Sequence, residues 1–441
     1  MSSDPTHNLQ YTWEPPKYEF TKPPSSTTVQ ETQDDDHEGP TGNFSRYAKF
    51  TPDGSAFLTH LENHTIQIFE FDSTTGEQGD PPPKPQLKLT LPQASPLVAT
   101  EWFPTASCRP EALAGFCFVA SVRECPVKLL DARDGRLRAS YPIVDHRERQ
   151  IAPHSLSFNF TGERLYCGFE DTIEIFDINR PGSEGTRLPT TPSKKSKDGL
   201  KGIISSLAFS TLYGADDTLF AAGSLTPRPD NIGLWVESQE AMVMSVGGGP
   251  RAGVVQMQFN PYRPHILYAT YRGIANNLIY SWDIRSNVHS PLIIFDARPS
   301  DSSGNPIPVP MSMRNQKMHF GLDVVGRYMG VGNSNGEIAV FDLQKAEGDA
   351  QDSQDEEASL QETSTSFPDF RFDAHKDAIG SVSFHPLQPQ LLSVSGSRHW
   401  VDNDDEDEHS EDSNDQGETR NSTSKIVTRD SSIKLWHWET P

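Results

Sequence analysis

The sequence predicts an all-β fold in which seven similar units close into a ring, and three observations support this prediction. Short segments of alternating apolar and polar residues recur along the chain, and convincing helical periodicity is absent. An aromatic residue beside a turn returns every 50 to 64 residues. Two further short apolar runs follow each of these aromatics. Because one unit of this size cannot bury its apolar faces alone, the repetition predicts an array of small sheets.

The first strand of each unit ends on an aromatic residue, often followed by proline or another turn former. These residues are Phe50, Trp102, Phe158, Phe209, Phe259, Phe320 and Phe384. A second run follows, and a third run alternates and ends on a bulky side chain. The third runs are residues 66–69, 127–131, 173–177, 232–235, 278–283, 338–342 and 433–436. Gly, Pro, Asn and Asp bound the runs, which is typical of strands joined by turns.

An aromatic or bulky residue followed by Asp ends several third runs, as in Phe176-Asp177 and Trp282-Asp283, and resembles the WD40 repeat. The resemblance implies a seven-bladed WD40 β-propeller, whose closure removes exposed sheet edges. Unit seven carries most of the hydrogen-bonding tetrad of that repeat, namely His375, Ser395, Asp430 and Trp436. A Ser-His-Asp set can also be a hydrolase triad. In this repeat the same atoms would be buried inside a sheet, so we interpret the tetrad as structural.

The domain prediction has four parts. Residues 1–42 are expected to be mostly disordered, with residues 11–20 supplying the fourth strand that unit seven lacks. Residues 43–441 are expected to form the propeller. Within it, residues 344–368 and 397–428 are expected to be disordered acidic insertions.

The formal net charge of −23 is concentrated in a few places. Residues 31–38, 347–362 and 402–418 hold five, seven and ten carboxylates and contain no Lys or Arg. Without these 22 carboxylates, the net charge of the chain is −1. The acidity therefore does not exclude an RNA ligand for the ring, although phosphates repel an acidic surface.

Several other classes of protein are disfavoured. No apolar stretch is long enough for a membrane helix, and the N-terminus lacks the apolar region of a secretory signal. The four cysteines, Cys108, Cys117, Cys125 and Cys167, lack the paired spacing of a zinc site. We therefore expect an intracellular protein without enzyme activity, cofactor or metal.

Basic residues indicate a binding face. In a WD40 propeller, the loops between second and third strands and those leading into the next blade share one face. The candidate RNA-binding residues on these loops are Arg123, Arg147, Arg149, Lys194, Lys195, Lys197, Lys201, Arg272, Arg314 and Lys317. Tyr271 and Phe169 are the best candidates for stacking on bases, and either can equally be core. Two alternatives remain: the basic residues are distributed by chance, or this face binds peptides.

Beyond the generic repeat, four stretches resemble one family, the telomerase Cajal body proteins (WRAP-type WD40 repeat proteins). They are residues 124–132 with 135–141, residues 154–158 with 162, 165–169 and 180–182, residues 194–195 with 202–210, and residues 281–286. The short N-terminal extension and the acidic insertions depart from the family pattern and suggest a fungal-like member. The resemblance implies a monomeric nuclear scaffold that binds small Cajal body RNA and telomerase RNA and assists ribonucleoprotein assembly and localisation. A protein-only scaffold in nuclear complexes, such as pre-mRNA splicing factors, is the alternative.

Overall fold

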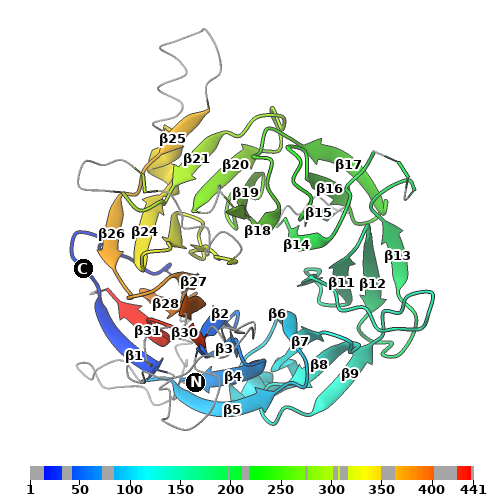
Figure 1. The fold of residues 1–441 in the computed structure, drawn as a ribbon, viewed down its shortest axis with the longest axis horizontal. Coiled ribbons are helices and arrows are strands. Elements are labelled where there is room, and N and C mark those ends of the chain that lie inside the picture. The colour runs from blue at the N-terminus through cyan, green and yellow to red at the C-terminus, as the bar shows by residue number, and fades with distance from the viewer. Residues whose placement is uncertain are drawn as a thin grey trace, which may run out of the picture.

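Seven antiparallel sheets surround a central axis, as Figure 1 shows in this computed structural model, which confirms the predicted seven-bladed β-propeller. The structure describes residues 14–31, 42–71, 84–193, 195–196, 198–210, 218–273, 277–300, 306–307, 316–348, 363–401 and 425–438. In each sheet the strands run in chain order from the axis outward, and the seventh sheet takes its outer strand from the N-terminal segment. The channel is therefore lined by the first strand of every blade.

The first four blades follow one pattern. Blade one contains β2 (Ser45–Phe50), β3 (Ala56–Leu61), β4 (Thr65–Glu70) and β5 (Gln86–Pro92). Blade two contains β6 (Leu97–Trp102), β7 (Cys117–Val122), β8 (Val127–Asp131) and β9 (Leu137–Tyr141). Blade three contains β10 (Ser155–Phe158), β11 (Arg164–Phe169), β12 (Thr172–Asp177) and β13 (Thr186–Pro189). Blade four contains β14 (Ile204–Phe209), β15 (Leu219–Ser224), β16 (Ile232–Val236) and β17 (Ala241–Val246).

The last three blades carry additions. Blade five contains β18 (Val254–Phe259), β19 (Ile266–Tyr271), β20 (Leu278–Asp283) and β21 (Ile293–Asp296), and β25 (Ser364–Ser366) adds a parallel fifth strand. Blade six contains β22 (Gly321–Leu322), β23 (Tyr328–Gly332), β24 (Glu337–Asp342) and β26 (Phe370–Asp373). Blade seven contains β27 (Ile379–Phe384), β28 (Gln390–Ser395), β31 (Ser432–His437) and β1 (Ser25–Glu31). A 3-10 helix, η1 (Pro110–Gly115), precedes β7.

The hydrophobic core lies between neighbouring blades. Trp235 and Phe220 of blade four pack with Tyr166 of blade three, and Trp282 of blade five packs with Leu234 of blade four. All five of these side chains are buried. The second and third strands are covered on both faces, so they contain nearly continuous apolar runs. Each blade is thus stabilised mainly by its neighbours.

The closing strand is β1, which pairs antiparallel with β31 from Ser25 opposite His437 to Glu31 opposite Ser432. The expectation that residues 11–20 supply this strand is therefore wrong. Pro15 and Pro16 lack backbone donors and disfavour a paired strand in that segment, whereas the β-branched run Thr27-Thr28-Val29 favours one. Residues 11–13 lie outside the described residues.

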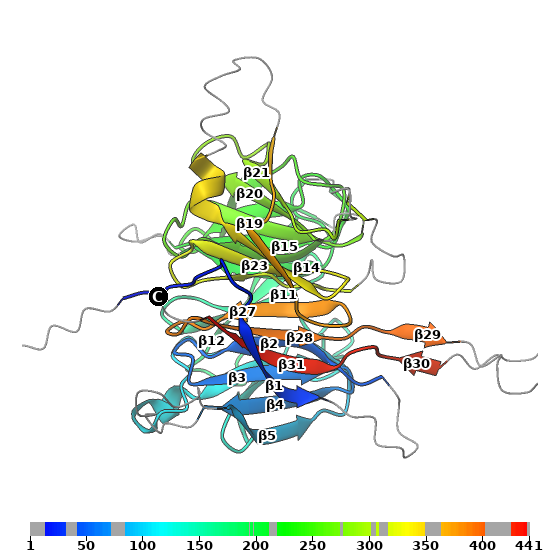
Figure 2. The same ribbon diagram turned by 90° about the vertical axis from the view of Figure 1, so that its left-hand side faces the viewer.

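Both acidic insertions are shorter than expected. The first of these, residues 344–368, begins inside a helix that spans residues 343–348, and Glu347 of this helix forms an ion pair with Arg263. Near its end, β25 is a strand. Within 397–428, β29 (His399–Val401) and β30 (Lys425–Val427) form a hairpin that projects from the ring (Figure 2). Residues 349–362 and 402–424 lie outside the described residues, so the prediction for them stays a prediction.

The hydrogen-bond tetrad of blade seven contains Ser393, and the assignment of Ser395 was wrong. The Trp436 indole donates to Ser393 Oγ at 2.8 Å, and Ser393 Oγ lies 2.7 Å from His375 Nε2. His375 Nδ1 lies 3.0 Å from Ser432 Oγ, which donates to Asp430 at 2.6 Å. Ser395 instead donates to the Asp377 carbonyl. The two serines share one face of β28, and the register of the tertiary structure selects between them.

No helix in the described part of the chain is both long and apolar enough to span a membrane.

Candidate nucleic-acid interface

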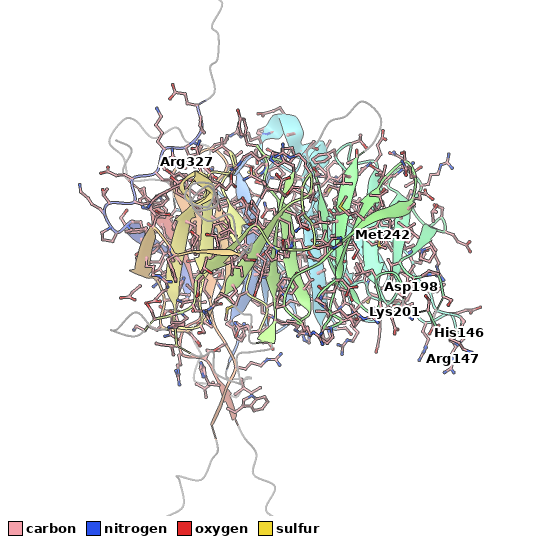
Figure 3. All side chains as sticks on the ribbon, turned by 90° about the horizontal axis from the view of Figure 1, so that it is seen from above. His146, Arg147, Asp198, Lys201, Met242 and Arg327 are labelled. Atoms are coloured by element: carbon pink, nitrogen blue, oxygen red, sulfur yellow. The ribbon has the colours of Figure 1, made fainter. Side chains whose placement is uncertain are left out.

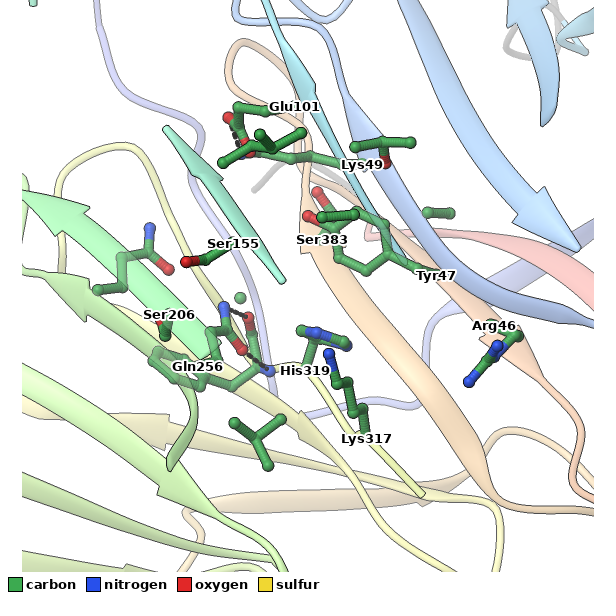
Figure 4. A pocket seen from close by; sticks show the side chains of 18 of the residues that line it. Arg46, Tyr47, Lys49, Glu101, Ser155, Ser206, Gln256, Lys317, His319 and Ser383 are labelled. Atoms are coloured by element: carbon green, nitrogen blue, oxygen red, sulfur yellow. Dashed lines mark hydrogen bonds and ion pairs between the residues drawn. The ribbon is translucent and has the colours of Figure 1, made fainter. Parts of the chain in front are cut away.

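A polar channel of about 770 Å³ runs along the propeller axis and is lined by the first strands of all seven blades (Figure 4). Polar side chains there join adjacent blades. The Met257 amide donates to Ser206 Oγ at 2.9 Å, and the side-chain amide of Gln256 makes two hydrogen bonds with the Phe320 backbone. Since these groups satisfy backbone atoms across a blade junction, many polar residues of the channel wall have a structural role.

One end of the channel opens on the face formed by the loops between second and third strands and by the loops that lead into the next blade. We call this the loop face. The β29–β30 hairpin projects from it, and Figure 3 shows Arg147 and Lys201 along the same edge of the molecule. Arg327 lies at the other face. The loops therefore share one face, as the repeat pattern implies.

Three cationic side chains gather where the channel meets the loop face. Lys317 precedes β22 and Arg46 lies in β2, and both line the channel. Arg272 follows β19 and lies close enough to Lys317 to act on its charge. Burial, together with the positive charges of Arg46 and Arg272, lowers the pKa of Lys317 to about 8. Among the described residues, Lys317 has no carboxylate within ion-pair distance. A phosphate at this position would relieve the mutual repulsion of the three cations.

Two imidazoles and a phenol form the channel wall beside Lys317. The His319 ring contacts Tyr47 edge to face at 4.8 Å, and Tyr47 also lies against His60. Burial, together with the nearby cations, lowers the pKa of His60 and of His319 to about 3. Both imidazoles are therefore neutral at physiological pH, and the positive charge of the mouth comes from Lys and Arg.

Deeper in the channel the charge is balanced. Lys49 of β2 and Glu101 of β6 form an ion pair of 2.7 Å. Burial alone would lower the pKa of Lys49, but the Glu101 carboxylate raises it above its usual value. This pair joins blades one and two and leaves no free charge for a ligand at that depth.

Glu62 organises the rim of the channel. It contacts Arg46 at 3.3 Å and also forms an ion pair with Arg398, so a single carboxylate holds two guanidinium groups. Trp400 follows Arg398 by two residues, lines the same channel mouth and is 60% exposed. The rim therefore combines surplus positive charge with an accessible aromatic ring.

The structure places the candidate residues of the loop face in two groups. Lys317 and Arg272 lie at the channel mouth, and Arg123 is exposed on the neighbouring β7–β8 loop. The peripheral group consists of Arg147, Arg149, Lys195 and Lys201 on loops of blades two to four. Arg149 is held by Asp145 at 2.8 Å. Lys194, Lys197 and Arg314 lie outside the described residues, so the prediction for them stays untested.

Sequence reasoning missed Arg46, Arg398 and Trp400. Arg46 lies within a strand, whereas the candidates were chosen from loops. Arg398 and Trp400 lie near the start of the predicted acidic insertion. The proposed stacking residues Tyr271 and Phe169 are 2% and 7% exposed and belong to the core. The apolar run preceding each of them was a usable signal for burial.

One polar cluster of the described residues contains the side chains of a hydrolase triad but not its arrangement. Ser397, His399 and Asp377 lie together, but His399 Nε2 contacts both the serine and the carboxylate. A hydrolase triad needs the carboxylate on the other ring nitrogen. Among the described residues, no three His, Cys, Asp or Glu side chains are placed to hold a metal ion.

The fold and the channel define the class of protein, a seven-bladed WD40 β-propeller whose loops surround a polar axial channel. No protein-family model matches the chain. The chain is similar to telomerase Cajal body protein 1 of Mesocricetus auratus, with 29% identity over 362 residues, or 81% of this chain and 59% of that protein. The Drosophila melanogaster homolog is 24% identical over 80% of this chain and 57% of its own length. The resemblance stated from the sequence is thereby confirmed.

Guanine nucleotide-binding protein negative regulator 1 of Schizosaccharomyces pombe is also similar, with 26% identity over 190 residues. That match covers 42% of this chain and 47% of the relative. This chain therefore spans less than two thirds of the relatives it matches, and their complete activities do not transfer to it directly.

Proposed function

We propose that this protein is a nuclear, non-catalytic scaffold that binds small RNA of the Cajal body type on its loop face and assists ribonucleoprotein assembly. The observation that carries the proposal is the surplus positive charge at the channel mouth, where Lys317 has no described carboxylate partner and Arg46 shares Glu62 with Arg398. Because RNA affinity comes largely from phosphate neutralisation, such a mouth suits a phosphate backbone. The printed names of the relatives supply the telomerase and Cajal body context.

The peripheral basic residues extend this surface away from the axis. Arg123, Arg147 and Lys195 are exposed and lie on the β7–β8, β9–β10 and β13–β14 loops, which belong to the loop face. An RNA strand that enters the mouth can therefore leave along a basic rim. We propose that the cluster Lys194, Lys195 and Lys197 belongs to this path.

The salt dependence of RNA affinity tests the proposal. Binding of purified small nuclear RNA should weaken as the salt concentration rises. Replacing Lys194, Lys195 and Lys197 with Gln should reduce the slope of log affinity against log salt concentration by about one per lost phosphate contact. A matched control neutralises Arg136, Arg180 and Arg285, which lie on the opposite loops with their side chains at least 63% exposed. Equal loss in the two triple variants would contradict a binding face.

Crosslinking in cells followed by RNA sequencing tests the ligand itself. Enrichment of small nuclear or Cajal body RNA supports the proposal. Its absence, together with stable protein partners, favours the second candidate, a protein-only nuclear scaffold. The name of the Schizosaccharomyces pombe relative refers to a regulatory protein and keeps this second candidate in view.

A further inference from the structure

We propose that Trp400 is a stacking platform for one unpaired base of a single-stranded nucleic acid, whose adjoining phosphates contact Arg46, Arg398 and Lys317. This inference rests on the proposed function. It adds the location of one binding subsite and the expectation that the RNA bound there is single-stranded. Trp400 and the three cations line one channel mouth, although they come from blade one, the approach to blade six, and the hairpin of blade seven. We call this set the Trp400 subsite.

The exposure of Trp400 sets it apart from the other described tryptophans. Its exposed fraction is 60%, whereas the others are at most 6% exposed, because they pack within or between blades. An indole left in water forgoes a large amount of apolar burial. The hairpin carrying it pairs Trp400 with Ile426, and this pairing accounts for the backbone but not for the exposed ring.

A buried carboxylate anchors the hairpin that carries Trp400. Asp377 is 2% exposed, accepts from Ser397 Oγ at 2.6 Å, contacts His399 at 3.0 Å and accepts from the Arg429 amide at 3.1 Å. These bonds attach both ends of the β29–β30 hairpin to Asp377, which lies just before β27, the first strand of blade seven. Gln316 also donates to the Gly396 carbonyl at 2.7 Å, which joins the segment of Lys317 to the same base. The indole and the ammonium are thus held against a common frame.

The charge pattern favours a nucleotide over an apolar peptide. Arg398 precedes Trp400 by two residues, and both residues line the same channel mouth. Glu62 contacts both Arg46 and Arg398, so one positive charge remains before Lys317 is counted. Aromatic rings beside a basic groove bind unpaired bases together with their phosphates. A duplex would hide its bases from the indole, so the subsite should select single strands.

Trp400 fluorescence provides a direct test with the full-length protein. The probes are short oligouridine, an abasic oligonucleotide of equal length, and a duplex. Oligouridine should quench the emission of the native chain and leave the emission of Trp400→Phe nearly unchanged, because the other described tryptophans are buried. The abasic strand should bind with little quenching, since it supplies phosphates without bases. Equal quenching by the abasic strand would overturn the inference.

Affinity measurements separate stacking from charge. Trp400→Ala should weaken oligouridine binding about tenfold without changing the salt slope, and Trp400→Phe should retain most of the affinity. Arg398→Gln should instead lower the slope. If oligouridine binds and Trp400→Ala binds equally well, the inference falls and the proposed function stands. If no RNA binds, both fall. Quenching by an acidic peptide without quenching by oligouridine would identify a protein partner and overturn the inference.

Discussion

At the scale of single residues, Lys317 makes the positive charge of the channel mouth depend on pH. Burial, and then the charges of Arg46 and Arg272, lower its pKa to about 8, so the ammonium loses its proton as the pH rises through that value. A phosphate contact favours the charged form and would raise this pKa. RNA binding near that pH should therefore take up a proton.

The resulting prediction concerns the pH dependence of RNA affinity. At constant ionic strength, affinity should fall by about three- to tenfold as the pH rises from one unit below about 8 to one unit above, because one phosphate contact is lost. Lys317→Arg should flatten the profile, since arginine keeps its charge. Lys195→Arg, at an exposed lysine of the same face, is the control and should leave the profile as in the native chain. Identical profiles for native and Lys317→Arg would contradict the role of Lys317.

The tetrad of blade seven supports a second prediction at this scale. Ser393 bridges the Trp436 indole and His375, so Ser393→Ala leaves two buried groups without their partner. It should lower the free energy of unfolding by about 1–3 kcal/mol, and Ser395→Ala should cost less, because that hydroxyl bonds only to backbone carbonyls. Denaturant unfolding measures both. A larger cost at Ser395 would contradict the assignment.

At the scale of elements, β1 and the segment before it close the ring. Tyr18 and Phe20 stack at 5.5 Å, and Tyr18 contacts Phe384 and Trp438 edge to face at 5.4 and 5.7 Å. These contacts fasten residues 14–22 against blades six and seven, while β1 pairs with β31. The aromatic segment and the closing strand are therefore two separate attachments.

Truncation distinguishes the two attachments. Removing residues 1–22 should lower the melting temperature by several degrees through lost aromatic packing, because each aromatic pair contributes about 0.5–1.5 kcal/mol beyond its buried area. Removing residues 1–31 should lower it further and promote association, since β31 becomes an open edge. Removal of residues 1–13 is the control. Equal melting temperatures for the two longer truncations would contradict closure by β1.

At the scale of the whole molecule, the charge divides between the ring and the acidic blocks. Two of the block carboxylates belong to folded elements, Glu31 in β1 and Glu347 in its ion pair with Arg263. Residues 402–418 lie in the sequence between β29 and β30, the two strands of the hairpin that carries Trp400, and hold ten carboxylates. We therefore expect a chain segment with this charge, attached at a basic mouth, to compete with weakly held phosphates.

Deleting residues 402–418 should therefore tighten nonspecific RNA binding at low salt. The difference from the native chain should shrink as salt rises, because the screening length falls from about 10 Å at 0.1 M to about 3 Å at 1 M. The control replaces the ten carboxylates with their amides at unchanged length and should behave like the deletion. Filter binding with unrelated RNA measures the effect, and unchanged affinity at low salt would refute this electrostatic role.

Repeats and strands could be predicted because each blade has the same local pattern. Alternation, turn residues and aromatic positions are set by neighbouring residues in the sequence, so Phe50 and Trp282 marked their strands correctly. The choices between similar local candidates could not be made in this way. Ser393 and Ser395 have the same alternation, and residues 11–20 and β1 both precede the ring.

By itself, the sequence determined a ring of seven small sheets, the separation of the acidic blocks from a nearly neutral ring, and the resemblance to telomerase Cajal body proteins. Only the tertiary structure decided which strand closes the ring and which side chains meet at its axis. Arg46, Arg272 and Lys317 belong to blade one, blade five and the approach to blade six, and their charges act on one another because ring closure arranges all of the blades around one axis. The physical reason is that strand patterns are local, whereas charge repulsion and burial depend on the neighbours that ring closure supplies.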